Sequence, residues 1–204
     1  MAEFFFKPWV GKNYGTKSCF RIPIMVLGES HYDWKERSIS HRRVTVELIK
    51  DELDGGNGIR FYTNIVASFL GAIPNSEQRK EFWNSVLFYN YIQEFVGNGP
   101  RMRPEYRMWS QSEPTFRHVL SKYKPRLIAV FGFTLWDELP NWGHDADPLK
   151  VDGLSVACYN FDAPGRFTAL APKLRHPSSS FNFRTWHPIL REAVGRVGGK
   201  SWMG

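Results

Sequence analysis

Three short, almost continuously apolar runs constrain the fold of this chain more than any other feature of its sequence. They cover residues 22–27, 86–91 and 127–132, and the second run meets its first polar residue at Asn90. A run of this length without alternating polar positions is typical of a strand that is buried on both faces, as in a parallel sheet. The runs therefore predict at least three adjacent strands at the centre of one sheet.

Segments with helical or strand patterning separate and follow these runs. Helices are predicted over residues 40–53, 61–70, 76–81, 113–122, 134–139 and 188–197, and two further strands over 154–159 and 167–171. Apolar strands that alternate with helices predict an α/β domain. The expected fold is a three-layer α/β/α sandwich with a central, mainly parallel sheet of about four or five strands. With 204 residues, the chain is expected to form a single domain over 1–204.

Composition narrows the class of protein. The formal charge is +7 and the pI is about 9.5, which favours a polyanionic partner such as DNA. Two cysteines, Cys19 and Cys158, are too few for a disulfide framework, a four-cysteine zinc site or an iron–sulfur cluster held by four cysteines. The start of the chain lacks the pattern of a signal peptide, and no run of residues is long and apolar enough to span a membrane. These features predict a cytoplasmic, monomeric protein without a metal or other cofactor.

Polar residues follow the predicted strands at the points where catalytic groups gather in α/β proteins. One polar loop covers residues 28–34, another covers 176–184, and Asn90 ends a strand between them in sequence. The carboxyl ends of parallel strands open on one edge of a sheet, so these residues can face one ligand. The Asn90 amide can both donate and accept, which suits the edge of a heterocycle with a carbonyl beside an N–H.

The order of these pieces resembles the uracil-DNA glycosylase superfamily, whose members flip a base out of DNA and hydrolyse its N-glycosidic bond. The matching segments are residues 28–32 (GESHY) for the first motif, 83–90 (WNSVLFYN) for the uracil-reading strand, 124–132 (KPRLIAVFG) for the third strand, and 176–179 (HPSS) for the second motif. The resemblance covers about residues 22 to 195.

The resemblance implies roles for residues around the base. His176 would donate to the carbonyl oxygen of the leaving base and stabilise the charge that develops there. Asn90 would read the base edge, Phe88 or Tyr89 would stack on it, and Tyr32 would crowd the methyl-bearing carbon of thymine. The complete set of expected base-binding residues is Asn90, Tyr32, Phe88, Tyr89, Gly28, Ser30 and His31.

The resemblance also implies contacts with DNA outside the base pocket. Residues 181–184 would form the loop that wedges into the helix, and Arg184 could bind a phosphate. The basic segment 97–109 adds two more candidate phosphate contacts. The expected DNA-binding residues are Ser178, Ser179, Phe181, Asn182, Phe183, Arg184, Arg101 and Arg103.

One residue departs from the motif of the family. Ser30 stands where one branch has the aspartate that orients water, and a serine hydroxyl is not a base at neutral pH. Another branch has glutamate in the second position of the motif, so Glu29 is the expected water-activating or cation-stabilising group, with Asp33 in reserve. The branches that share this glutamate often carry an iron–sulfur cluster, which two cysteines cannot hold. The resemblance gives no role to His31 beyond a substrate contact.

The sequence predicts a monofunctional DNA glycosylase of base excision repair that acts on uracil or a related base. Ser30 in place of aspartate leaves a second hypothesis, a DNA- or nucleotide-binding module on the same fold that has lost hydrolysis. A third hypothesis is a hydrolase of a non-nucleic substrate that uses Ser30 or a metal ion. The spacing of the histidines does not match a metal-binding motif.

Overall fold

A computed structural model describes residues 5–33, 41–55, 59–99, 102–163, 167–178 and 180–202 of the chain. The strands are β1 (Trp9–Val10), β2 (Ile24–Gly28), β3 (Val86–Asn90), β4 (Leu127–Phe131), β5 (Gly143–Val151), β6 (Leu154–Ala163) and β7 (Phe167–Leu174). The helices are α1 (Val44–Leu53), which follows the short 3-10 helix η1 (His41–Arg43), α2 (Arg60–Leu70), α3 (Ser76–Ser85), α4 (Tyr106–Tyr123), α5 (Phe133–Asp137) and α6 (Phe183–Arg196).

The strands form one mixed sheet in the order β1-β3-β2-β4-β7-β6-β5. The pairs β2–β3, β2–β4 and β4–β7 are parallel, whereas β1–β3, β6–β7 and β5–β6 are antiparallel. The α/β class is therefore confirmed, but the expected four or five strands correspond only to the middle of a seven-stranded sheet. The additional strands arise because β5, β6 and β7 continue the sheet as an antiparallel meander and β1 pairs with its opposite side.

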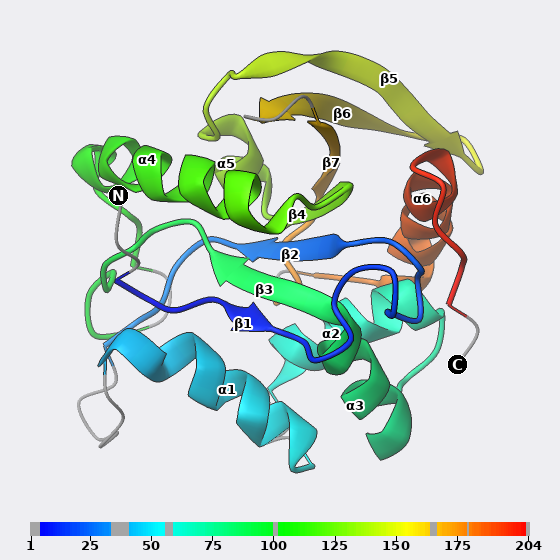
Figure 1. Ribbon diagram of the computed structural model, residues 1–204, viewed down its shortest axis with the longest axis horizontal. Coiled ribbons are helices and arrows are strands. Elements are labelled where there is room, and N and C mark those ends of the chain that lie inside the picture. The colour runs from blue at the N-terminus through cyan, green and yellow to red at the C-terminus, as the bar shows by residue number, and fades with distance from the viewer. Residues whose placement is uncertain are drawn as a thin grey trace.

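Helices cover both faces of the sheet (Figure 1). On one face, alternate residues such as Val26 and Phe88 pack with α1, α2, α3 and α6. On the other face, Leu27 and Tyr89 pack with α4 and α5. All residues of β2, β3 and β4 are buried, which explains why the sequence of each strand is apolar without alternation. The result is two apolar layers around a central sheet.

Local sequence explains some helix boundaries but not others. Asn75, directly before the predicted helix over 76–81, caps α3: its side chain accepts from the Gln78 backbone N–H at 2.9 Å, and the Gln78 side chain accepts from the Asn75 N–H. Helix α4 was expected to start at Glu113 because Pro114 favours an early helical position. It begins instead at Tyr106 and runs through the proline, because its buried face packs on the sheet over that whole length.

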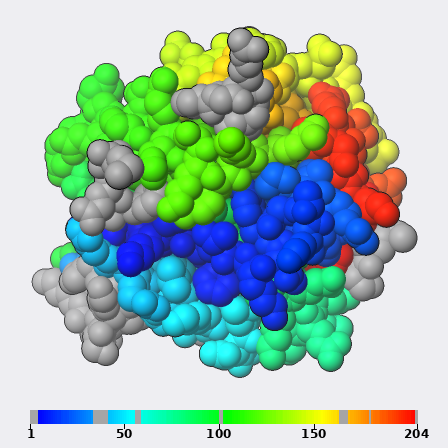
Figure 2. All heavy atoms as spheres, viewed as in Figure 1, coloured from blue at the N-terminus to red at the C-terminus, as the bar shows by residue number. Residues whose placement is uncertain are grey.

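The two edge strands of the sheet, β5 and β1, have different surroundings. Strand β5 is mostly exposed and carries Asp145, Asp147 and Lys150, and charges of this kind discourage pairing with another chain. At the other side, the short β1 belongs to an N-terminal segment that forms the centre of the visible face, between α4 and α1, in Figure 2. The backbone N–H of Gly11 donates to Val86 in β3 at 3.0 Å, which holds this segment against the sheet.

Candidate functional site

Gly28 and Asn90 end the neighbouring strands β2 and β3 and lie in register with each other. A Cβ atom on Gly28 would collide with the Asn90 side-chain oxygen and would lie 3.6 Å from the Phe88 ring. Asn90 is only 5% exposed, yet its side-chain amide makes no hydrogen bond with the described residues. The glycine thus makes room for a buried amide whose donor and acceptor are both available.

Backbone hydrogen bonds fix the first polar loop against the segment that follows β3. The N–H groups of Tyr91 and Ile92 donate to the carbonyls of Gly28 and Glu29, both at 2.9 Å. Further along, the Val96 N–H donates to His31, and the Asp33 N–H donates to Gly97, again at 2.9 Å. These hydrogen bonds and an isolated parallel bridge between His31 and Phe95 fasten the loop to the segment after β3, which holds Glu29 at the sheet edge.

Glu29 and Arg103 form a loose ion pair across this edge. The Arg103 guanidinium lies 3.8 Å from the Glu29 carboxylate, and the two side chains are 72% and 12% exposed. Burial raises the pKa of Glu29, and the charge of Arg103 opposes this shift. Glu29 comes directly after Gly28, the last residue of β2, so this ion pair lies at the same edge of the sheet as Asn90.

His176 follows β7 and is oriented by Ser178. The Ser178 backbone N–H donates to Nδ1 of His176 at 3.3 Å, and the Ser178 hydroxyl lies 2.8 Å from the same nitrogen. Because a backbone N–H can only donate, Nδ1 accepts, and the neutral ring carries its proton on Nε2. Burial lowers the pKa of His176, and the nearby Arg103 lowers it further. The imidazole is therefore a neutral donor at physiological pH.

Phe61, which no sequence motif singles out, connects these elements. Its ring centroid lies 5.3 Å from that of His176 and 6.4 Å from that of Phe88. Phe61 is half-buried in the first turn of α2, and Asn64 of the same helix donates to the Pro177 carbonyl at 2.7 Å. A half-buried aromatic ring between His176 and Phe88 can stack on a flat ligand. Only the tertiary packing of α2 reveals it.

Two of the expected base-binding residues lie elsewhere. Tyr89 points to the face opposite Asn90, where it is buried against Phe116. The side chain of His31 is buried near Thr45, with Nε2 of His31 2.7 Å from the threonine hydroxyl, and it packs against Phe6. Burial lowers the pKa of His31 to about 3. The expected base contact by Tyr89 does not fit its position, because strand alternation turns this side chain to the face opposite Asn90, whereas His31 is held in the core by Thr45 and Phe6.

The remaining expected residues of the first loop are half-buried at the sheet edge. Ser30, Tyr32 and Asp33 make no side-chain hydrogen bond with the described part of the chain. Phe88, by contrast, is buried beneath the edge and packs against Tyr62 and Trp83. Phe88 can thus form the floor of a site next to Gly28, whereas Phe61 is the more accessible ring.

The expected wedge loop is partly built into the core. Phe183 is buried in the first turn of α6, and Phe181 stacks on Trp186 with centroids 6.2 Å apart. Asn182 caps the helix by accepting from the Arg184 backbone N–H at 3.1 Å. A wedge built from the two phenylalanines does not fit these positions, because both rings fill space around α6. Arg184 is exposed.

Ser178 is exposed next to His176, and Arg103 is exposed next to Glu29. Ser179 and Arg101 lie outside the described residues. The segment around Arg103 also exposes Met102 and Tyr106, and Tyr106 is 86% exposed. Exposed apolar side chains beside an arginine are common where proteins contact single-stranded or distorted nucleic acid. The sequence analysis selected this segment for its positive charge and did not select the exposed Met102 and Tyr106.

Within the described ranges, no group of three or more His, Cys, Asp or Glu side chains is placed to hold a metal ion. No helix in the same ranges is long and apolar enough to cross a membrane. In comparisons with known proteins, no family model and no curated protein sequence matched the chain. The arrangement of residues at the sheet edge is therefore the basis for any functional assignment.

Proposed function

We propose that this protein is a monofunctional DNA glycosylase that hydrolyses the N-glycosidic bond of a flipped uracil or related base. The proposal rests on one observation above all: a buried Asn90 amide without a side-chain hydrogen bond to the described residues and a His176 ring protonated on Nε2 occur at the same edge of the sheet. The Phe61 ring contacts both His176 and the Phe88 ring beside Gly28. These groups match the edge, the carbonyl oxygen and the flat face of a nucleobase.

The chemistry that these residues could perform follows from their charges. As the glycosidic bond breaks, negative charge moves onto the base and positive charge onto the sugar. The Nε2–H of His176 would stabilise the base anion by donating to its carbonyl oxygen. The Glu29 carboxylate would orient water or stabilise the sugar cation. Arg103, beside both residues, would bind a flanking phosphate and thereby withdraw from Glu29 when DNA is present.

The proposal is tested by single-turnover excision on oligonucleotides that carry uracil, hypoxanthine, xanthine, thymine mispairs or oxidised pyrimidines. Abasic sites are detected by alkaline cleavage. We expect one of these bases to be excised by the wild type, and Asn90→Ala to lose most of that activity. His144→Ala, which changes an exposed histidine on β5, serves as the matched control. A wild type that excises no base on the panel would contradict the proposal.

Tyr32 tests whether the base is a pyrimidine. The ring is half-buried next to Ser30 and carries no hydrogen bond to the described residues. If it crowds the methyl-bearing carbon, Tyr32→Ala should admit thymine and other 5-substituted pyrimidines. If Tyr32→Ala keeps the parent activity and gains none of these substrates, the ring does not set the size of the pocket.

A second candidate is a DNA-binding module that has lost hydrolysis, and Ser30 favours it. A serine hydroxyl next to Glu29 is not a base at neutral pH and cannot take the place of a water-activating carboxylate. Ser30→Asp discriminates between the two candidates. Excision that appears only in Ser30→Asp would indicate a binding module, whereas an active wild type would indicate an enzyme.

A further inference from the structure

A hollow of about 720 Å³ opens at the opposite end of the sheet from the candidate site. It lies beside the residues that precede β2 and β3, whereas Gly28 and Asn90 are at the carboxyl ends of those strands. Five residues of strand span about 16 Å at roughly 3.3 Å each, so the two places are separate. The lining residues are Asn13, Thr16, Lys17, Ser18, Cys19, Arg21, Glu81, Ser85, Lys200, Ser201 and Trp202.

Three cations in this lining have no acidic partner among the described residues. Lys17, Arg21 and Lys200 are exposed at the hollow, and none of them forms an ion pair within the described ranges. The single acid of the lining, Glu81, accepts from the Trp202 indole N–H at 3.0 Å. The hollow therefore carries excess positive charge that an anion could compensate.

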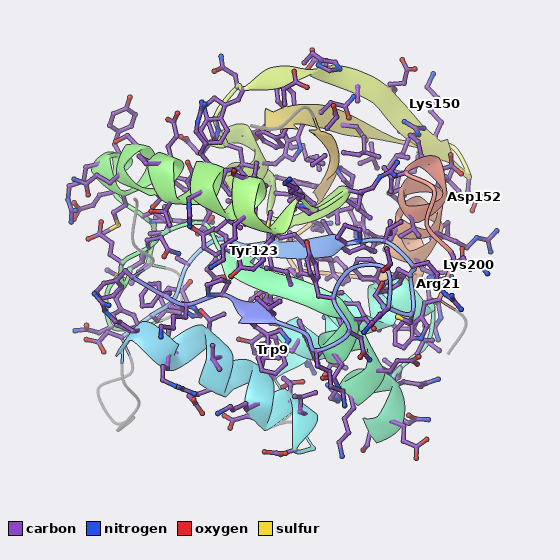
Figure 3. The ribbon with its side chains drawn as sticks, in the orientation of Figure 1. Trp9, Arg21, Tyr123, Lys150, Asp152 and Lys200 are labelled. Atoms are coloured by element: carbon purple, nitrogen blue, oxygen red, sulfur yellow. The ribbon has the colours of Figure 1, made fainter. Side chains whose placement is uncertain are left out.

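The backbone holds these cations together from two distant parts of the sequence. The Lys200 N–H donates to the Phe20 carbonyl at 2.9 Å, and the Arg21 N–H donates to Ser18 at 3.0 Å. Figure 3 shows Arg21 and Lys200 side by side at the same end of the molecule, next to the C-terminal segment that follows α6. Backbone hydrogen bonds thus hold the segments of Arg21 and Lys200 together, so the two cations do not meet only because their side chains are long.

Arg21 adopts a conformation that arginine rarely takes. Its φ is 61°, in the left-handed region that favours glycine. A non-glycine residue in this region costs free energy, and such positions are concentrated at binding sites. Glycine would fit the turn with less strain, so Arg21 holds its guanidinium at the hollow at a conformational cost.

The other groups of the hollow suit an anion. Thr16 and Ser201 expose hydroxyl groups that make no hydrogen bond with the described residues. Burial raises the pKa of Cys19 to about 12, so its thiol stays neutral and adds no negative charge. An arginine with two lysines matches a phosphate group, which accepts paired hydrogen bonds from guanidinium and point charges from ammonium.

We propose that this hollow binds a small phosphate-bearing anion with a diphosphate group. A volume of this size can hold a diphosphate alone or a nucleotide. The inference is independent of the proposed glycosylase activity, because none of its residues belongs to the candidate site.

Titration calorimetry at low salt tests the proposal with pyrophosphate, ADP and AMP as probes. We expect pyrophosphate or ADP to bind, and the double variant Arg21→Gln/Lys200→Gln to weaken that binding by at least about tenfold, since it removes two of the three cations at the hollow. Binding of pyrophosphate would indicate that the diphosphate group alone is enough for binding. Binding of ADP without pyrophosphate would indicate a nucleotide held by its diphosphate.

A control variant removes the same charge, one lysine and one arginine, outside the hollow. Lys150 on β5 and Arg191 on α6 are exposed and make no ion pair within the described ranges, so Lys150→Gln/Arg191→Gln should leave the affinity unchanged. Arg21→Gly separates binding from folding, because it should lose affinity while its unfolding midpoint stays at or above that of the wild type. Equal losses in both double variants, or no binding of pyrophosphate and ADP by the wild type, would overturn the proposal.

Discussion

The side-chain oxygen of Asn90 occupies the space that a Cβ atom on Gly28 would need. The two residues are paired at the ends of neighbouring parallel strands, so the backbone of one determines where the amide of the other can lie. Because both strands are buried along their whole length, neither can move aside to admit an extra methyl group. The pairing of β2 with β3 therefore determines the position of the Asn90 amide.

Gly28→Ala should displace the Asn90 amide and abolish most excision while leaving the protein folded. The added methyl group overlaps one flexible side chain end but sits above the Phe88 ring, so we expect a loss of stability of about 1–3 kcal/mol, as for overpacking in a core. Urea unfolding and single-turnover excision measure the two effects. Gly153→Ala, in an exposed turn with open space and a φ of 78°, is the control, because it adds backbone strain away from the site. Full activity in Gly28→Ala would contradict the role given to Asn90.

His176→Ala should slow excision by about 10²–10³-fold, the usual cost of removing one donor to a developing oxyanion, with little change in DNA affinity. Ser178→Ala removes the hydroxyl next to Nδ1 but keeps the backbone N–H, so its effect should be smaller. Nitrogen NMR of the imidazole should find the proton on Nε2. A proton on Nδ1, or equal rates for His176→Ala and wild type, would exclude His176 as the donor.

Glu29 should set the acidic side of the pH–rate profile. Burial raises the pKa of this carboxyl and Arg103 opposes the shift, so removing the cation in Arg103→Gln should move the acidic limb of kcat/KM to higher pH. Glu29→Gln should reduce the rate by roughly 10²-fold or more. An active enzyme that is indifferent to Glu29→Gln would leave Asp33 as the candidate.

His31 should make the protein less stable in mild acid. Its pKa is about 3 in the folded state because of burial and about 6.5 when unfolded. Between these values only the unfolded chain binds the proton, so stability falls by up to about 1.4 kcal/mol for each unit that the pH drops below 6.5. Urea unfolding at pH 7 and pH 5.5 should show this fall in the wild type and a smaller one in His31→Gln. Identical pH dependence in both would show that His31 is not the group responsible.

DNA binding should be strongly dependent on salt, since the chain carries a charge of +7. The logarithm of the affinity should fall with the logarithm of the salt concentration by about 0.9 for each phosphate contact. Fluorescence anisotropy with a duplex should show a slope that is about one contact smaller in Arg103→Gln, whereas Lys150→Gln on β5 should match the wild type. Affinity that does not change with salt would argue against DNA as the partner.

The sequence by itself determined the buried centre of the fold. Strands β2, β3 and β4 lie close to where their apolar runs predict them, because a strand buried on both faces must be apolar throughout. The same runs place Gly28, Asn90 and the 28–33 loop at one edge of the sheet, since the carboxyl ends of parallel strands open together. These conclusions need only local composition and the direction of the chain.

Tertiary structure decided the outer strands and the final composition of the site. Strand β5 has few apolar residues to mark it, because an edge strand forms through pairing with β6 and not through burial of its own side chains. Phe61 meets His176 only because α2 packs across the sheet, and Phe183 enters the core only because α6 begins five residues before Pro188. Contacts between residues more than a hundred positions apart leave no periodicity in the sequence, and the packing of whole elements determines them.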